Sequence, residues 1–156
     1  MNIRRATESD IPAVLKMLSQ VLELHADIRP DIFIPNTTKY SAEDLADMFT
    51  DDSRPVYVAE DDGAVYGYAF CQLQDPPFTS TMVPHKILYL DDLCVDESAR
   101  GKHVGSALFE HVKSEAKRLG CYEVTLNVWE GNDKAIGFYR SMGMKTKETQ
   151  MEYILQ

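Results

Sequence analysis

The residues best suited to chemistry gather in one short stretch, Arg100-Gly101-Lys102-His103-Val104-Gly105-Ser106. It follows an apolar run, Ile87 to Val95, and precedes a helical pattern, Val104 to Leu119. A strand, a glycine-bearing turn and a helix start therefore meet within a few residues. The first N–H groups of a helix lack intrahelical partners and lie at the positive end of the helix dipole, which suits a phosphate. The sequence thus points to a phosphate-bearing cofactor.

Two carboxylates interrupt the apolar run just before this turn. Asp91 and Asp92 are adjacent, and successive strand residues face opposite sides, so one of them should face a cleft unless a bulge intervenes. A carboxylate in a cleft can bind an ammonium group or relay its proton through water. The alternative is a buried carboxylate that is satisfied by loop amides.

The pattern of apolar residues predicts the elements that must position these groups. Strands are expected at residues 3–6, 55–60, 64–73, 86–95 and 122–128, with one or two more between Lys145 and Leu155. Helices are expected from about 11 to 25, from about 41, over 104–119 and over 132–142. The order β-α-α-β-β-β-α-β-α-β implies an α/β fold with a mixed sheet and helices on its faces. The two parallel strands joined by the 104–119 helix can splay apart at the turn, a usual ligand site.

Composition limits the classes of function. The 156 residues suggest one domain, 1–156, and the net charge of −9 disfavours nonspecific nucleic-acid binding. The acidic charge either serves solubility or attracts a cationic substrate. The three cysteines form no CxxC, the histidines show no metal-site spacing, and no apolar run suits a signal peptide or a membrane span. We expect a cytoplasmic protein without a metal.

Three motifs resemble those of one family. The turn reads Arg100-Gly101-Lys102-His103-Val104-Gly105, a later run reads Asn132-Asp133-Lys134-Ala135-Ile136-Gly137-Phe138-Tyr139-Arg140-Ser141-Met142-Gly143-Met144, and the chain opens with Ile3-Arg4-Arg5-Ala6-Thr7-Glu8-Ser9-Asp10. In this order they resemble the GCN5-related N-acetyltransferases (GNAT), which move an acetyl group from acetyl-CoA to an amine. Three positions depart from the family pattern: His103 replaces a glycine, Met144 replaces a phenylalanine, and Tyr89 stands where some members have an acidic base.

The resemblance implies a role for each candidate residue. The backbone of Leu93, Cys94 and Val95 would pair with pantetheine and the thioester carbonyl. Residues 100–106 would wrap the pyrophosphate, with Arg100 and Lys102 adding charge or merely facing solvent. Asn132 would cap its helix and also contact the cofactor. The Tyr139 hydroxyl would return a proton to the CoA thiolate, unless Tyr139 is only core. Catalytic candidates are thus Tyr139, Asp92 and Asp91; cofactor candidates are Leu93, Cys94, Val95, Arg100, Gly101, Lys102, His103, Val104, Gly105, Ser106, Asn132 and Tyr139.

The resemblance further implies direct transfer of the acetyl group to a primary amine on a small molecule. Alternatives are a protein N-terminal or lysine acetyltransferase, a non-catalytic acyl-CoA-binding module, and an acetyl-cysteine intermediate on Cys94, for which no partner histidine is identifiable. The acceptor side is expected from residues 22–40 and the tip at 76–84, with His25, Asp27, Arg29, Phe33 and Tyr40 as candidates. Terminal strands or helices could pair two copies as a homodimer.

Overall fold

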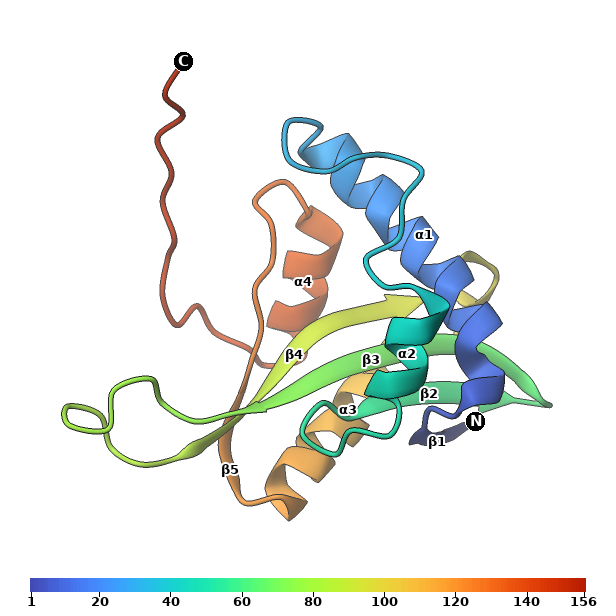
Figure 1. Cartoon of the computed structure of the whole chain (residues 1–156), viewed down its shortest axis with the longest axis horizontal. Coiled ribbons are helices and arrows are strands. Elements are labelled where there is room, and N and C mark those ends of the chain that lie inside the picture. Colours follow the sequence, from blue (N-terminus) through green and yellow to red (C-terminus); the bar gives the residue numbers. More distant parts are fainter.

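The computed structural model describes all residues, 1–156, and its ribbon is shown in Figure 1. The strands are β1 (Asn2–Arg5), β2 (Val56–Asp61), β3 (Ala64–Gln74), β4 (Lys86–Val95) and β5 (Cys121–Thr125). The helices are α1 (Ile11–Ile28), α2 (Ala42–Met48), α3 (Val104–Arg118) and α4 (Asp133–Ser141), with short 3-10 turns η1 (Glu8–Asp10) and η2 (Glu97–Ala99). None of these helices has both the length and the apolar character needed to cross a membrane.

The strands form one mixed sheet in the order β1-β2-β3-β4-β5. The pairs β1–β2, β2–β3 and β3–β4 are antiparallel. The pair β4–β5 is parallel, and its two strands are joined through α3. Asp62 and Gly63 both have positive φ, which is the geometry of a two-residue turn between β2 and β3. The expected mixed sheet, its hairpin and the β4–α3–β5 unit are confirmed.

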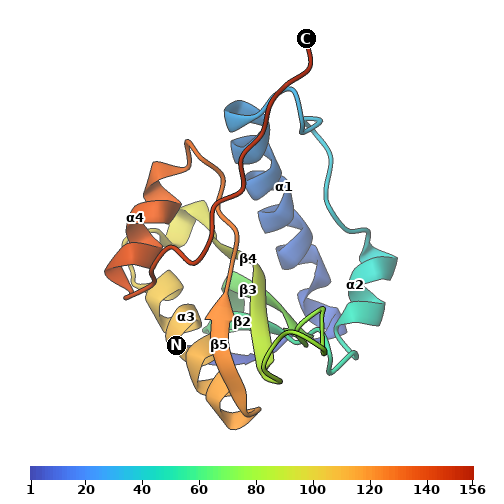
Figure 2. The same cartoon turned by 90° about the vertical axis from the view of Figure 1, so that its left-hand side faces the viewer.

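Helices cover both faces of the sheet, as Figure 2 shows. On one face, α1 and α2 pack on a core that includes Val58, Tyr68 and Phe70. On the other face, α3 packs on a second core that includes Ala69 and Leu90, and α4 lies beside it through Phe138 and Tyr139. Alternate residues of β3 thus enter opposite cores, as the two-residue period of a strand requires.

A close approach of α3 to the sheet fixes the position of its first turn. A Cβ on Gly67 of β3 would lie 2.9 Å from both Leu108 Cδ1 and Val104 Cγ1. Only a residue without a side chain fits under the helix at that point, and a larger residue would push the start of α3 away from the end of β4.

Two expectations for the last part of the chain need correction. The fifth strand is Cys121–Thr125 rather than 122–128, because it leaves β4 after Thr125 and pairs with nothing beyond it. The prediction of terminal strands between Lys145 and Leu155 is wrong, since residues 145–156 belong to no strand or helix of this chain. Their alternating pattern suits an extended backbone, but a strand also needs a neighbour, and the chain's own sheet does not provide one.

Candidate active site

A gap opens in the sheet where β4 and β5 diverge. Their pairing runs from Lys86 opposite Cys121 to Tyr89 opposite Thr125 and then ends. Beyond it, Leu93, Cys94 and Val95 keep their partners in β3 but face no strand on the β5 side. Backbone groups along that edge are free to bond an extended ligand. The splayed sheet expected from the sequence is present.

The turn between β4 and α3 leads directly out of this gap. The α3 N-cap, His103, forms no side-chain cap, and the first N–H bond within the helix is that of Ala107 to the carbonyl of His103. The N–H groups of Val104, Gly105 and Ser106 therefore have no acceptor in the chain. Arg100 and Lys102 are exposed and form no ion pair. Free donors at the positive end of a helix, flanked by two cations, form a phosphate cradle.

The conformation of the turn explains the motif residues. Gly101 has φ of +83° and His103 has φ of +61°, so two positions of the turn are left-handed. A glycine adopts this region without strain, whereas the histidine at the second position costs about 1–2 kcal/mol. Asp96 anchors the preceding residues, because its carboxylate accepts hydrogen bonds from the Ser98 N–H (2.9 Å) and hydroxyl (2.7 Å).

A bulge in β4 places both carboxylates on the same face of the sheet. Phe70 pairs with Asp92 and Cys71 with Leu90, so Asp91 is the extra residue. Without the bulge the two carboxylates would face opposite sides; with it, both reach the α1–α2 face. The Asp91 carboxylate contacts residues of the α1–α2 loop, and that of Asp92 contacts Tyr68, a core residue of the same face.

Asp92 has the electrostatic character of a general base. Burial raises the pKa of its carboxyl group, and the charge of Asp91 raises it further. A hydrogen bond from the Tyr68 hydroxyl (2.6 Å) lowers it, and the resulting pKa is about 6. A carboxylate with that pKa is ionised at pH 7, yet it is far more basic than an ordinary aspartate.

Asp91 differs from Asp92 in that it forms an ion pair with a lysine of the same chain, Lys39. Its Oδ2 accepts hydrogen bonds from Lys39 Nζ (2.9 Å) and from the Tyr40 hydroxyl (3.2 Å). The Tyr40 ring stacks on Phe70 with ring centroids 5.6 Å apart, which fixes the loop against the sheet. Burial opposes the charge of Lys39, but the hydrogen bond to Asp91 and the charges of Asp91 and Asp92 raise its pKa above the usual value. The lysine ammonium is thus held near both carboxylates.

Tyr139 is half-buried and packs against the core on the α3–α4 side, the face that its helical spacing predicts. Its ring contacts Phe109 (centroids 6.0 Å apart) and Phe138 (5.2 Å apart), and its hydroxyl forms no hydrogen bond in the chain. Burial, followed by the nearby charge of Asp92, raises the pKa of the phenol well above its usual value. The hydroxyl is therefore a donor that stays protonated, and complete proton loss to a thiolate is uphill.

The remaining sequence candidates have simpler surroundings. Asn132 caps α4, accepting a hydrogen bond from the Ala135 N–H (3.3 Å). The Tyr89 hydroxyl accepts one from Asn127 (3.2 Å) and adds no carboxylate. Burial raises the pKa of the Cys94 thiol to about 12, and its Sγ lies 3.8 Å from the Met17 carbonyl, so it is a poor nucleophile.

The proposed acceptor side is only partly assembled. The rings of His25, Phe33 and Trp129 contact one another in turn, with centroid distances of 5.1 and 5.4 Å, and the second contact is edge-to-face. The Arg29 guanidinium lies 5.7 Å from the Trp129 ring centre. This aromatic cluster joins the end of α1 to the segment after β5; Asp27 is exposed. The tip at 76–84 does not join it, since Figure 1 shows this loop projecting to the left beyond β3 and β4, away from the end of α1.

Two residues around the carboxylates were not anticipated. Tyr68 is fully buried and donates to Asp92, and Lys39 holds Asp91. A signal for Tyr68 exists in the sequence, because a tyrosine within a core strand needs a polar partner for its hydroxyl. That this partner is Asp92 follows only from the register of β3 and β4. Lys39 lies in a loop, and its contact with Asp91 depends on how α1 and α2 pack.

Comparisons with known proteins agree with this geometry. The model of the acetyltransferase (GNAT) family matches residues 18–144. A glucosamine 6-phosphate N-acetyltransferase from Trypanosoma brucei brucei is 26% identical over 97% of this chain and 93% of its own. A peptidyl-lysine N-acetyltransferase, YjaB, from Salmonella typhimurium is 28% identical over 93% of this chain and 83% of its own.

The architecture also matches a solved structure over its full length. A point mutant of the BH1408 protein from Bacillus halodurans is 33% identical, covers 100% of both chains and superposes with a TM-score of 0.94. With a family model that spans most of the chain, and with relatives that are N-acetyltransferases, the assignment is plain: this chain belongs to the acetyltransferase (GNAT) family and is an N-acetyltransferase.

Proposed function

We propose that this enzyme uses acetyl-CoA and transfers the acetyl group directly to a primary amine of a small molecule. One observation carries the proposal: the uncapped N-terminus of α3 adjoins the unpaired edge of β4. A phosphate cradle and a free strand edge, side by side, match the two chemically different parts of coenzyme A, its diphosphate and its amide-bearing pantetheine.

The residues present suit this co-substrate. The backbone N–H groups of residues 103–106 would hold the diphosphate, and the free side of Leu93, Cys94 and Val95 would pair with the pantetheine amides and the thioester carbonyl. Arg100 and Lys102 add charge at the turn. Asn132 lies at the start of α4 and caps it, and we propose that it also contacts the cofactor. Acetyl-CoA supplies the activated acetyl group.

Asp92 is proposed as the base that receives the proton of the acceptor ammonium, directly or through water. The amine nitrogen then bonds to the thioester carbonyl carbon as the carbon–sulfur bond breaks. Tyr139 would donate a hydrogen bond to the departing thiolate; its raised pKa favours this over complete proton transfer. Direct transfer is preferred over a route through Cys94, whose thiol is protonated at neutral pH.

The acceptor is proposed to be cationic. Asp91, on the same face as Asp92, already holds an alkylammonium, that of Lys39, whose Nζ lies 2.9 Å from its carboxylate. Small amines present the same group, so an amine that enters from the α1–α2 loop can take the place of Lys39. A lysine side chain in the site equally favours peptidyl-lysine as a second candidate acceptor.

Release of free thiol from acetyl-CoA tests the proposal. The enzyme and acetyl-CoA are mixed with one acceptor at a time. The acceptors are diamines, amino sugars, glucosamine 6-phosphate, aminoglycosides and a lysine-containing peptide. We expect thiol release with a cationic small amine at a kcat/KM well above that of the peptide. A preference for the peptide would favour the second candidate, and no release with any acceptor would contradict the proposal.

Removal of the internal cation should improve binding of the acceptor. In Lys39→Met, Asp91 loses its ion pair, and the KM for a diamine is expected to fall about 2- to 5-fold, the range of a partly exposed pair, with kcat unchanged. Initial-rate kinetics measures this. Lys113→Met, which breaks an equally short pair with Glu110 on α3, is the matched control and should leave KM alone. A higher KM in Lys39→Met would show that Lys39 binds the acceptor instead.

A further inference from the structure

A lysine of the chain lies where an acceptor amine is proposed to bind. The Nζ atom of Lys39 donates a hydrogen bond to Asp91 (2.9 Å), the neighbour of the proposed base Asp92. The chain's other lysine ion pairs lie elsewhere, and they are Lys16 with Asp96, Lys113 with Glu110 and Lys147 with Glu123. Lys39 is therefore the one lysine whose ammonium pairs with either of these two carboxylates.

The ammonium is close to the strand edge that would hold the thioester. That edge begins at Leu93, two residues after Asp91, which is roughly 7 Å along an extended strand. Lysine carries its charge on a flexible four-carbon stem, and the Lys39 side chain is half-exposed, so no packing locks it in one position. The nitrogen can therefore leave Asp91 and approach the thioester carbonyl without a movement of the backbone.

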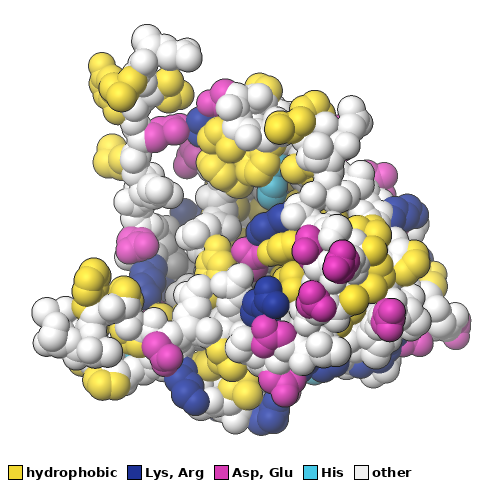
Figure 3. Space-filling view, in the orientation of Figure 1, with side chains coloured by type: hydrophobic (Ala, Val, Ile, Leu, Met, Phe, Trp, Pro, Cys, Tyr) yellow, Lys and Arg dark blue, Asp and Glu magenta, His cyan; other side chains and the backbone are white.

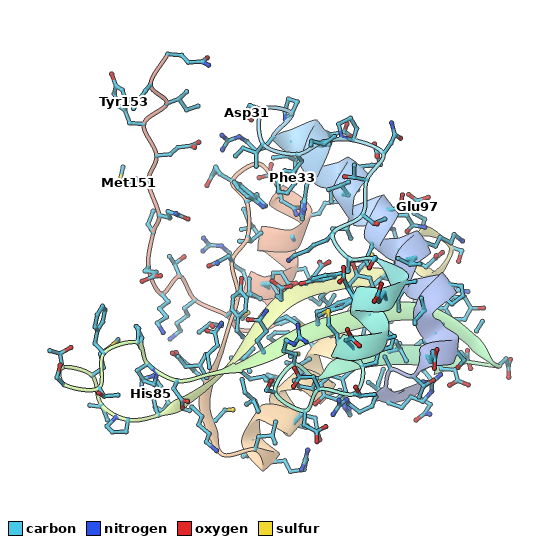
Figure 4. The ribbon with its side chains drawn as sticks, viewed as in Figure 1. Asp31, Phe33, His85, Glu97, Met151 and Tyr153 are labelled. Atoms are coloured by element: carbon cyan, nitrogen blue, oxygen red, sulfur yellow. The ribbon has the colours of Figure 1, made fainter.

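The α1–α2 loop that carries this lysine is fixed at both ends. At the α1 end, the Phe33 ring contacts Trp129 edge-to-face (centroids 5.4 Å apart), and Figure 4 shows Phe33 beside the segment that leads into α4. At the α2 end, the Tyr40 ring stacks on Phe70 (5.6 Å). Between them, residues 34–40 form no backbone–backbone hydrogen bond. A nitrogen held beside its target in this way reacts as if it were highly concentrated.

We propose that Lys39 is an internal acceptor, which the enzyme acetylates on Nζ when acetyl-CoA is bound and no external amine is present. The proposal rests on the proposed use of acetyl-CoA. Asp92 takes one proton from the ammonium, and the neutral nitrogen bonds to the thioester carbonyl carbon as the carbon–sulfur bond breaks. The second proton of the nitrogen goes to the departing sulfur, and the first passes from Asp92 to water. The products are acetyl-lysine, the CoA thiol and one proton.

The reaction occurs once in each chain and is slower than turnover of a free amine. Burial lowers the pKa of Lys39, but the hydrogen bond to Asp91 and its charge raise it above the usual value, so the ammonium gives up its proton reluctantly. Initial rates with freshly mixed enzyme therefore report the unmodified form.

Acetylation of Lys39 opens the site to a cation. It removes the positive charge of the lysine, so the ion pair with Asp91 is lost and this carboxylate becomes available. Acidic side chains also gather over α2, which follows the loop, as Figure 3 shows. They are Glu43, Asp44 and Asp47, all exposed. The enzyme would thus raise its own affinity for a cationic acceptor whenever acetyl-CoA is plentiful.

Mass spectrometry tests the modification directly. The enzyme is incubated with acetyl-CoA alone, and the intact chain should gain one acetyl group, which peptide mapping should place on Lys39. Lys113 is the matched internal control, since its pair with Glu110 is equally short (2.9 Å) and its side chain is 44% exposed, against 52% for Lys39. Because Lys113 reacts only with acetyl-CoA from solution, Lys39 should be acetylated at least about 100-fold faster.

Two variants assign the reaction to the site of the same chain. Asp92→Asn should slow acetylation of Lys39 at least about 100-fold, as loss of a general base does, and leave the background at Lys113 unchanged. Lys39→Arg keeps a cation beside Asp91 and should gain no acetyl group. When unlabelled enzyme is mixed with isotope-labelled Asp92→Asn, the acetyl group should appear on the unlabelled chain alone.

A kinetic measurement tests the consequence. After incubation with acetyl-CoA, the KM for a diamine should fall to the value found for Lys39→Met, and an acetylated enzyme with an unchanged KM would overturn the activation. Equal acetylation of Lys39 and Lys113, or an unmodified Lys39 in an enzyme that acetylates an added amine, would overturn the internal acceptor and leave the proposed function standing. Failure to acetylate Lys39 or any added amine would contradict both proposals.

Discussion

Asp92→Asn is expected to lower kcat by about 10²- to 10⁴-fold, the usual effect of removing a general base, and at the same time to stabilise the fold. Asparagine has the size of aspartate and can still accept the hydrogen bond from Tyr68, but it cannot take a proton. The activity of the unchanged enzyme should rise with pH up to about 6, the pKa of Asp92, and level off above it. This limb of the pH profile should vanish in the variant.

The gain in stability follows from the sign of the pKa shift. The pKa of Asp92 is about 6 in the folded protein and 3.8 in the unfolded chain, so the folded state disfavours the charged form. The resulting cost is absent below pH 3.8, grows between 3.8 and 6, and is complete above 6. At pH 7 the neutral asparagine should raise the free energy of unfolding by about 1–2 kcal/mol, or roughly 3–6 °C in Tm. Thermal denaturation at pH 4 and pH 7 should show the gain only at the higher pH.

Two neighbouring variants make this test specific. Tyr68→Phe removes the hydrogen bond that holds the pKa of Asp92 down, so the limb near pH 6 should move upward with its shape preserved. Asp91→Asn leaves Asp92 in place and should alter the KM of the acceptor more than kcat. If Asp91→Asn lost the acid limb and Asp92→Asn kept it, the two carboxylates would have to exchange roles.

The second large effect is expected at Tyr139. Tyr139→Phe removes one hydroxyl and retains the ring that packs on Phe109 and Phe138. A donor aimed at charge that develops in the transition state is worth about 100-fold in kcat, so we expect a loss of that size. Affinity for CoA, measured by calorimetry, should change less than about threefold, because the hydroxyl acts only as the thiolate forms.

Tyr57→Phe is the matched control for this loss. Tyr57 is buried and donates to Glu115 (3.3 Å) on α3, but it contacts none of the proposed site residues. It should leave kcat within a factor of about two. Unchanged turnover in Tyr139→Phe would assign Tyr139 to the core alone, which is the simpler interpretation of its position in the sequence.

The sequence predicted those parts of the site that depend on local order along the chain. The turn at Arg100–Ser106 lies between a strand and a helix whose patterns are strong, and the structure places its free N–H groups at the start of α3. Lys86–Val95 was predicted with its observed bounds. Residues near in sequence position one another through helix geometry, and a single sequence contains that information.

What the sequence did not predict depends on contacts between distant segments. One extra residue in β4 decides that Asp91 and Asp92 share a face, and no residue type there signals a bulge. The hydrogen bond between Tyr68 and Asp92 depends on the register of β3 against β4. The contact of Lys39 with Asp91 depends on how α1 and α2 pack on the sheet. Residues 145–156 show the converse: their pattern predicts a strand, but no strand of the chain's own sheet pairs with them.

Calorimetric titration with two ligands measures the central claim most directly. CoA contains the diphosphate and pantetheine lacks it, while both contain the chain that would pair with β4. If the bare main-chain N–H groups before Ala107 hold the diphosphate, CoA should bind at least about 100-fold more tightly than pantetheine. Equal affinities, or no heat with CoA, would contradict the account.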